Sequence, residues 1–361
     1  MKLFPALEKR YSKEQMSALA ARRLAHEISF GAVVFQVSRL MIKFGILQML
    51  VDSKKGLTLD EVAEKTKISK YACQRLLESS LTIGTVLFHD GKFSCSKAGW
   101  FLLSDPMVKV NIDFNHDVNY LGLFHLEEAL LNDKPEGLKV FGRWDTIYEG
   151  LSKLPEQAQK SWFTFDHYYS DRSFDEALKI VFKNKPKTLL DVGGNTGRWA
   201  LRCVDYNADV QVTIMDLPQQ ISLMKHYTAD KKGAERIHGY CCNLLDKTVQ
   251  FPNGFDAIWL SQFLDCFSDD EVTSILSRAA QSMNTDSKLY IMELLWDRQC
   301  FEAAAYALTQ ISIYFAAIAN GNSKMYHSDD MIRCIENAGL TVEEIKDGIG
   351  NWHSIIICKK I

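Results

Sequence analysis

Residues 186–206 read PKTLLDVGGNTGRWALRCVDY, and this stretch decides the fold. The apolar run up to Asp191 predicts a strand, the following GGNTG predicts a tight loop, and a helix is expected from about Arg198. Glycines permit positive φ and close approach of a ligand, and the helix N-terminus offers free N–H groups. Asn195 stands where a third glycine would be expected, and asparagine tolerates the left-handed conformation better than most residues. The spacing is neither G-x-G-x-x-G nor a P-loop, so the stretch indicates a ligand loop without naming the ligand.

From about residue 185 onward, short apolar runs alternate with helical segments. The β-rich runs are TLLDVGG, VQVTIMDLP, IHGYCCNLL, FDAIWLSQFL and KLYIMELLW, and two further strands, LTVEEIKDG and HSIIICKKI, close the chain. This alternation predicts an α/β fold with a mostly parallel, doubly wound, seven-stranded sheet. Ligands of such sheets bind at the carboxyl ends of the strands, beside the point where the strand order reverses.

Polar side chains stand at these strand ends. Asp216 ends the second run, where an acid is placed to accept hydrogen bonds from ribose hydroxyls; the alternative is a helix cap before Pro218. At the end of the third run, Asn243 and its apolar neighbour Leu244 are placed to hold an adenine ring. Together, the glycine loop and these residues predict an adenosine-containing ligand.

The first part of the chain has a different pattern. Residues 14–50 are mostly helical and carry much apolar surface, which needs a partner in the chain or in a second subunit. Residues 57–103 read as helix, turn, helix and a hairpin closed by Asp90-Gly91, which is a winged helix. We therefore predict a helical domain over 1–104 and a sheet domain over 105–361, with 105–182 as a helical bridge that lines the substrate pocket.

Charge is divided unevenly between these parts. The whole chain of 361 residues has a net charge of −3, with 47% hydrophobic and 24% charged residues, which excludes a disordered chain. Residues 1–110 hold 17 Lys and Arg against 10 Asp and Glu, whereas the remainder holds 25 against 35. The basic excess raises the alternative of DNA binding by the winged helix. Its second helix offers Lys70, Gln74 and Arg75 but also Glu78, a weaker concentration of cations than DNA readers show, so nucleic acid is not the favoured partner.

The compartment follows from segments that the sequence lacks. The N-terminus has no apolar core of a signal peptide, and no stretch approaches 18 uninterrupted apolar residues, so we expect no membrane span. The nine cysteines are scattered, odd in number and without C-x-x-C, which favours free thiols in a reducing cytoplasm. The spacing of zinc ligands is also missing, and we expect no metal.

The order DVGGNTG, IMDLP, HGYCCNLL, LSQFLDCFSDDE and KLYIMELL behind a winged helix resembles the S-adenosylmethionine-dependent O-methyltransferases of the plant caffeate and bacterial antibiotic type. The resemblance spans roughly residues 15–361. It implies a Rossmann-like C-terminal domain, an N-terminal dimerisation domain and a homodimer formed through the N-terminal helices. It also implies metal-independent methylation of a small hydroxylated aromatic, with S-adenosylhomocysteine as the second product.

The resemblance also implies which residues hold the cofactor. The loop glycines match those around the methionine part, Asp216 matches the ribose-binding acid, and Asn243 stands where the family usually has Asp near the adenine amino group. FDHYYSDRS looks like the family's F-N-x-x-M-x-x-x-S segment, so Tyr169 replaces a methionine of the methyl site. The implied cofactor-binding residues are Gly193, Gly194, Gly197, Asp216, Leu217, Asn243, Leu244, Ser261 and Ser173.

The catalytic positions depart from the family pattern. The family's base is a histidine, and here Asp265 occupies that place. One acid that orients the histidine is matched by Glu293; the other falls near Met325 and is lost, and His327 is a possible substitute two residues further on. Proton transfer from a phenol with a pKa near 10 to an ordinary aspartate near 3.9 is uphill by about six units, or about 8 kcal/mol.

Three interpretations follow. Asp265 is a working base whose pKa is raised by burial or by Glu293; or catalysis proceeds by proximity and orientation or through His327; or the protein has lost catalysis and is a cofactor-binding or DNA-associated regulator. The sequence does not separate O-methylation, which we favour, from methylation of a ring carbon, and it names neither the substrate nor the pathway. Candidate substrate contacts are Tyr120, His125, Trp162, Tyr169 and Tyr314.

Overall fold

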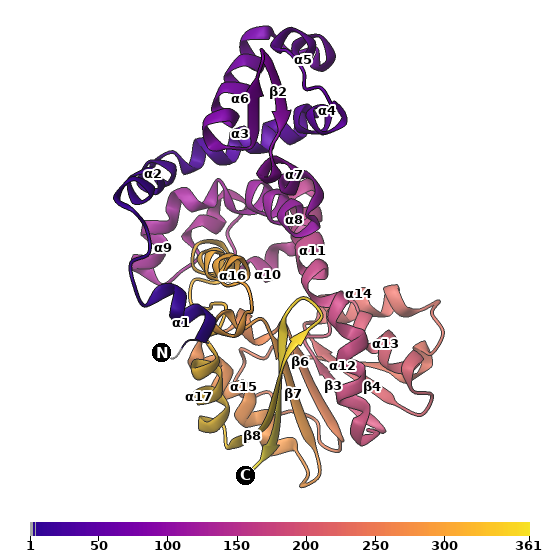
Figure 1. The fold of residues 1–361 in the computed structure, drawn as a ribbon. Coiled ribbons are helices and arrows are strands. Elements are labelled where there is room, and N and C mark those ends of the chain that lie inside the picture. The colour runs from indigo at the N-terminus through magenta and orange to yellow at the C-terminus, as the bar shows by residue number, and fades with distance from the viewer. Residues whose placement is uncertain (1–2, 4) are drawn as a thin grey trace. The chain divides into compact units, whose positions relative to one another are not determined.

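The computed structural model describes residue 3 and residues 5–361. These form two compact units, an N-terminal unit of residues 13–117 and a C-terminal unit that joins the described residues up to 12 with residues 118–361. The predicted domain boundary at residues 104 and 105 falls inside the first unit, between its last two α-helices. Figure 1 shows both units as ribbons.

The N-terminal unit is a helical domain with a two-stranded wing. The helix–turn–helix segment before the wing begins with a capping box, in which the Thr58 hydroxyl and the Glu61 carboxylate each accept a backbone N–H of the other residue. Asp90 and Gly91 both have positive φ and close the antiparallel hairpin, as the winged-helix prediction requires. The elements are α2 (Ala18–Ser29), α3 (Gly31–Lys43), α4 (Ile46–Asp52), α5 (Leu59–Thr66), α6 (Lys70–Ile83), β1 (Val86–His89), β2 (Lys92–Cys95), α7 (Lys97–Ser104) and α8 (Pro106–Phe114).

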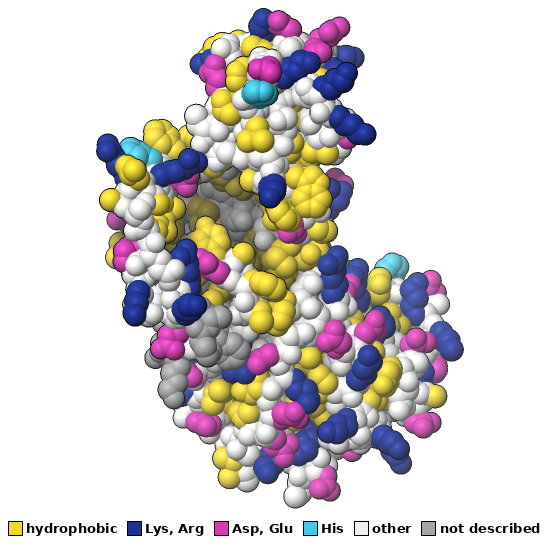
Figure 2. All heavy atoms as spheres, viewed as in Figure 1, with side chains coloured by type: hydrophobic (Ala, Val, Ile, Leu, Met, Phe, Trp, Pro, Cys, Tyr) yellow, Lys and Arg dark blue, Asp and Glu magenta, His cyan; other side chains and the backbone are white. Residues whose placement is uncertain are grey.

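Helix α2 buries no residue within this structure. Leu19 is 80% exposed and Ile28 is 71% exposed, although the helix is amphipathic. Phe30 and Val33, where α3 begins, are exposed as well. Figure 2 shows hydrophobic side chains among Lys and Arg on the face of this unit that it presents. An apolar helix face of this kind needs a cover outside the described residues of the unit.

The C-terminal unit is built on a seven-stranded sheet in the order β5-β4-β3-β6-β7-β9-β8. The first five strands in this order are parallel, and β9 runs antiparallel to both of its neighbours, β7 and β8, so the sheet is mostly parallel, as predicted. The chain moves outward from β3 through β4 to β5 and then returns to β6 on the other side of β3, so the strand order reverses between β3 and β6. The strands are β3 (Thr188–Val192), β4 (Gln211–Asp216), β5 (Ile237–Cys241), β6 (Ala257–Ser261), β7 (Lys288–Glu293), β8 (Leu340–Ile349) and β9 (His353–Lys360).

Helices cover both faces of this sheet, because side chains alternate along each buried strand. Leu189 packs with the helices α12, α13 and α14 on one face, whereas its neighbour Leu190 packs with α15 and α17 on the other. These helices are α12 (Phe174–Val181), α13 (Arg198–Tyr206), α14 (Pro218–Thr228), α15 (Asp269–Ser282) and α17 (Ser328–Asn337).

The helical bridge, together with one helix near the N-terminus and one after β7, completes the C-terminal unit. These helices are α1 (Pro5–Tyr11), α9 (Leu126–Asn132), α10 (Ile147–Gly150), α11 (Glu156–Ser170) and α16 (Glu302–Tyr314). Short 3-10 turns lie among them, including η2 (Gly122–His125), η5 (Asp171–Ser173) and η8 (Leu264–Cys266), and α16 runs on into a π-helical turn, η10 (Phe315–Ala319).

One helix is apolar and long enough to cross a membrane by length and composition alone. Among the described residues it is the continuous segment Glu302–Ala319, of which 44% is buried inside the structure. Helices α3 and α4 would pass the same test only as one pair bent by 60°. Partly buried core helices of other proteins pass this test too, so it is weak evidence for a span.

Candidate active site

The glycine loop after β3 adopts the conformation that its sequence predicts. Gly193 has a φ of 74° and its N–H donates to the Met215 carbonyl at 2.9 Å. Asn195 has a φ of 49°, so the asparagine takes the left-handed conformation in place of a glycine. Gly197, with a φ of 83°, is the N-cap of α13. The loop therefore delivers the free N–H groups of a helix start to the carboxyl ends of the strands.

Asp216 ties this loop to the end of β4. Its Oδ2 accepts the Asn195 N–H at 2.9 Å, and its Oδ1 accepts the Leu217 N–H at 2.7 Å. Burial raises the pKa of its carboxyl to about 6, although both hydrogen bonds favour the charged form. Because each carboxylate oxygen has a second lone pair, the side chain keeps the capacity to accept hydrogen bonds from a ligand.

A second acid lies beneath the loop. Asp191 is 2% exposed, and its Oδ2 has no hydrogen-bond partner among the described residues. Burial, and then the charge of Asp216, raise the pKa of Asp191 well above its ordinary value. A Cβ at Gly194 would lie 2.5 Å from that Oδ2, so only glycine lets the loop close over the acid.

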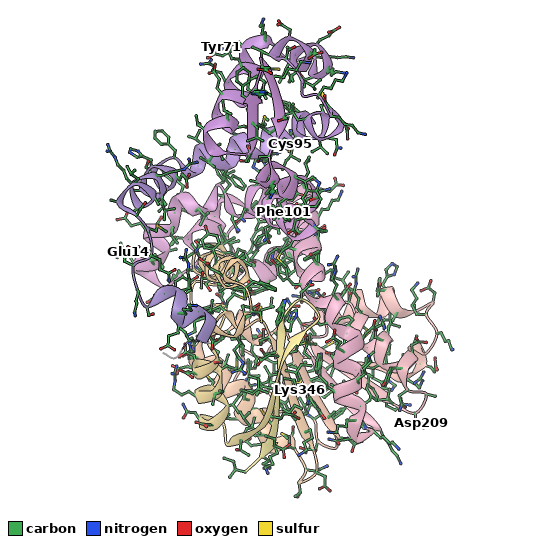
Figure 3. All side chains as sticks on the ribbon, in the orientation of Figure 1. Glu14, Tyr71, Cys95, Phe101, Asp209 and Lys346 are labelled. Atoms are coloured by element: carbon green, nitrogen blue, oxygen red, sulfur yellow. The ribbon has the colours of Figure 1, made fainter. Side chains whose placement is uncertain are left out.

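The remaining residues with a predicted cofactor role lie around these strand ends. Asn243 is exposed and its Oδ1 accepts the Leu245 N–H at 3.0 Å, whereas Leu244 is 6% exposed and packs into the core. Ser261 is half-buried at the end of β6. Ser173, in η5, is fully buried with its hydroxyl 2.8 Å from His353 Nδ1. Asp209, labelled in Figure 3, precedes β4 and marks the opposite, amino end of the strands.

Glu293 holds the turn that carries Asp265. Its Oε1 accepts the N–H groups of Phe263 at 3.0 Å and Leu264 at 2.8 Å, which are 30 and 29 residues away in the chain. Its Oε2 is buried and has no hydrogen-bond partner among the described residues. Asp265 is the next residue in η8 and is 7% exposed. The two predicted catalytic acids are therefore brought together.

The surroundings of this pair raise the pKa values of both acids. Burial raises the pKa of Asp265 to about 6. Burial and the charge of Asp265 raise the pKa of Glu293 well above its ordinary value. Two buried carboxyls in electrostatic contact do not both ionise readily, so the pair retains a proton to a higher pH than two separate carboxyls would.

Two residues predicted as aromatic substrate contacts, Trp162 and Tyr314, contact each other. Trp162 Nε1 on α11 donates to the Tyr314 hydroxyl on α16 at 2.8 Å. Burial raises the pKa of Tyr314 above its ordinary value, and Cys266, Asp166 and Asp265 lie within electrostatic range and add to the effect. Tyr169, 3% exposed, follows on α11 and packs on Phe165.

The structure gives two predicted histidines other local partners. His327 is 5% exposed and caps α17, since its Nδ1 accepts the Asp329 N–H at 3.0 Å, and its ring lies edge-on to Trp296. His125 Nδ1 lies 3.5 Å from the Glu128 carboxylate, next to the exposed Phe124 ring. Tyr120 is half-buried, just before η2.

Comparison with known proteins decides the family. A model described as "Methyltransferase domain" matches residues 165–345, half of the chain, and therefore includes the glycine loop, Asp216, Asp265 and Glu293. The chain belongs to this methyltransferase family. A second model, described as a Dimerisation2-like domain, matches residues 22–93.

Relatives of this methyltransferase extend over almost its whole length. The L-tyrosine C(3)-methyltransferase of Streptomyces lavendulae is 22% identical over 340 residues, covering 92% of this chain and 91% of that protein. The mitomycin biosynthesis 6-O-methyltransferase of the same organism is 23% identical over 335 residues, covering 90% of each. The family match and these relatives confirm the predicted family and enzyme class.

Solved structures share its fold. The mitomycin 7-O-methyltransferase has a TM-score of 0.70 at 19% identity, covering 95% of this chain and 98% of that one. An O-methyltransferase from neocarzinostatin biosynthesis, solved with S-adenosylmethionine and 2-hydroxy-5-methyl naphthoic acid, has a TM-score of 0.66 at 17% identity, covering 91% and 96%. The fold class is confirmed, and the ligand of the second structure agrees with the predicted cofactor.

Two site residues of this methyltransferase were missed by the sequence reasoning. Asp166 lies one turn after Trp162 on α11; an acid inside the aromatic run FDHYY is the signal that could have found it. Asn320 Nδ2 donates to the Cys266 carbonyl at 2.6 Å and so fixes the end of η8. That contact joins residues 54 apart, and no local pattern announces it.

Proposed function

We propose that this S-adenosylmethionine-dependent methyltransferase methylates a small hydroxylated aromatic without a metal, with Asp265 as the base. The observation that carries the proposal is the placement of Asp265: on a turn held by Glu293, at the carboxyl ends of the strands, and within electrostatic range of Tyr314. We favour methylation of the oxygen. Methylation of a ring carbon is the alternative, and the relatives named above include both a C- and an O-methyltransferase.

The residues at the strand ends fit the cofactor. A Cβ at Gly193 would lie 2.2 Å from the Phe263 ring, so glycine keeps a narrow space open between the loop and that ring. Asp216 is placed to accept ribose hydroxyls, as acids at the end of the second strand do in nucleotide-binding sheets. We assign the methionine part to the loop glycines and the adenosine part to Asp216, Leu217, Asn243 and Ser261. Ser173 and Leu244, which are buried, support these contacts from behind. When bound, S-adenosylmethionine supplies the electrophilic methyl group.

Asp265 is a better base than an ordinary aspartate. With its pKa at about 6, the gap to a phenol near 10 falls to about four units, or roughly 5 kcal/mol. Glu293 supports this role by holding the turn and by keeping its own proton. We give His327 a lesser part, because its Nδ1 accepts the capping bond and its Nε2 faces the Asp297 carboxylate at 3.7 Å. Trp162, Tyr169 and Tyr314 are the aromatic walls that orient the acceptor; Tyr120 and His125 stay more distant candidates.

We also propose a cytoplasmic homodimer. The Dimerisation2-like match covers α2 and α3, whose apolar side chains are exposed within one chain. Cys241 and Cys300 are free and exposed, which suits a reducing compartment. DNA is not the partner we favour, because Lys70 and Arg75 of α6 are already engaged in ion pairs with acids.

The test is transfer of a labelled methyl group across phenolic amines, phenolic acids, catechols and polyketide phenols, with and without a chelator. We expect turnover that survives chelation and falls by two or more orders of magnitude in Asp265→Asn, and a smaller loss in Glu293→Gln. Unchanged turnover in both variants would remove the two acids from the mechanism. Asp270→Asn, a change in the first turn of α15, is the matched control and should behave as the wild type.

A further inference from the structure

One face of α11 carries Trp162, Asp166 and Tyr169. These residues are separated by four and three positions, so they lie on one side of the helix, one turn above the other. The Trp162 Nε1 bond to the Tyr314 hydroxyl at 2.8 Å fixes that side against the end of α16. Asp166 therefore sits between two side chains already assigned to the acceptor site.

Asp166 is partly buried on this face of α11. Its side chain keeps 28% of its surface accessible, so a ligand can reach the carboxyl, and burial raises the pKa of that carboxyl to about 7. The charged groups around it are Asp265 and Asp171, which raise its pKa, and Arg198, which lowers it. Arg198 itself is paired with Asp171.

His167, the next residue on α11, does not provide Asp166 with a positively charged partner at neutral pH. Its Nδ1 lies 3.7 Å from the Asp166 carboxylate. Burial and the charge of Arg198 lower the pKa of His167, so the imidazole is neutral at the pH of the cytoplasm.

The site then has more negative than positive charge. Asp265 and Asp166 supply up to two negative charges when ionised, and the sulfonium of the cofactor would balance one. Glu293, 2% exposed with an unpartnered Oε2, is a third acid on the Asp265 side. This excess of negative charge favours the binding of a second cation and disfavours the binding of a further anion.

We propose that Asp166 determines specificity by binding a protonated amine on the acceptor, so that the substrate is a phenol that also carries an ammonium group. This inference rests on the proposed function, because it concerns the acceptor of the same site. A phenolic acid would instead add a carboxylate to a site that already holds Asp166 and Asp265.

The experiment compares two probes of similar size and opposite charge, tyramine and 3-(4-hydroxyphenyl)propanoate. Calorimetric titration of the full-length protein saturated with S-adenosylhomocysteine, at pH 8, keeps the tyramine amine protonated and Asp166 ionised. We expect tyramine to bind at least tenfold more tightly. Asp166→Asn should reduce that ratio at least tenfold, and Asp166→Glu should retain most of it. Asp175→Asn, which removes an exposed carboxylate paired with Arg202, should leave the ratio unchanged.

The outcomes separate the two proposals. Failure of the wild type to bind S-adenosylhomocysteine would count against the proposed function. Normal binding of that ligand, combined with equal affinity for the probes, preference for the propanoate or binding of neither probe, would overturn the inference about Asp166 alone. If Asp166→Asn does not fold, equal affinity of the wild type for the two probes still overturns the inference.

Discussion

Asp265 and Glu293 are two carboxyls that titrate as one unit, and their division of labour comes from their surroundings. Glu293 is anchored by two backbone N–H groups, and its high pKa reflects burial and the nearby charge of Asp265. In the proposed mechanism Asp265 carries the negative charge and accepts the proton, and its pKa of about 6 suits that part. An unperturbed histidine has a pKa near 6.5, close to the value of about 6 for Asp265, so as the proposed base Asp265 would differ from a histidine mainly in being negatively charged when free.

The pH dependence of turnover follows from that pKa. Because Asp265 must be deprotonated to accept a proton, kcat/KM should be full above about pH 6 and should fall as the pH drops through that value. A pH–rate profile with labelled cofactor checks this, and Asp265→Asn should lose the acidic limb. A wild-type profile that is flat from pH 5 to 8 would speak against Asp265 as the base.

At the scale of elements, the acid-bearing turn η8 is held from several sides. Glu293 reaches it from β7, Asn320 reaches it from the end of η10, and the Tyr326 hydroxyl donates to the Phe267 carbonyl just beyond it. Helix α15 then begins with the Ser268 capping box.

Local features of the chain could be predicted from residue type, as the turn at Asp90-Gly91 and the left-handed conformation of Asn195 show. The hydrogen bonds of Glu293 and Asn320 could not be predicted, because they join residues that are far apart in the sequence and come together only in the folded protein.

Loss of the Asn320 bond should loosen η8 without damaging the cofactor site. In Asn320→Ala the Cys266 carbonyl loses its donor, which costs about 1–3 kcal/mol if the group stays buried. We expect kcat to fall at least tenfold while the affinity for S-adenosylhomocysteine stays within twofold. Stopped-flow or steady-state rates and calorimetric titration measure the two quantities. Equal losses in both would mean that Asn320 supports the whole fold rather than this turn.

For the whole molecule, the alternation of apolar strands and helices was enough to predict the sheet, because parallel strands must be buried on both faces. The acceptor side was less predictable. The bridge from 105 to 182 and the helix that ends at Tyr314 show helical periodicity, which does not tell which side chains face the site. Trp162 and Tyr314 were therefore proposed together with His125, whose described partners are its own helical neighbours. Asp166 was not predicted, because the sequence does not show which face of the helix this acid occupies among its aromatic neighbours.

The apolar face of α2 predicts association at the same scale. We expect a dimer at micromolar concentration, and Leu19→Lys with Ile28→Lys should shift it toward monomer, because both side chains are more than two-thirds exposed in one chain. Light scattering coupled to size exclusion measures this. Lys13→Glu, a change outside α2, is the control. The measurement is made at about 50 micromolar, because dissociation depends on protein concentration. A monomeric wild type at that concentration would contradict the proposed homodimer.

The two N–H groups that donate to Glu293 have a spectroscopic consequence. The amide protons of Phe263 and Leu264 point at one oxygen of a buried carboxyl, so their resonances report the charge on that carboxyl without any added probe. Their exchange with deuterated solvent would be slow while the bonds persist, and it would quicken in step with any opening of the turn. These two amide signals therefore report the protonation of Glu293 and the opening of the turn that it holds.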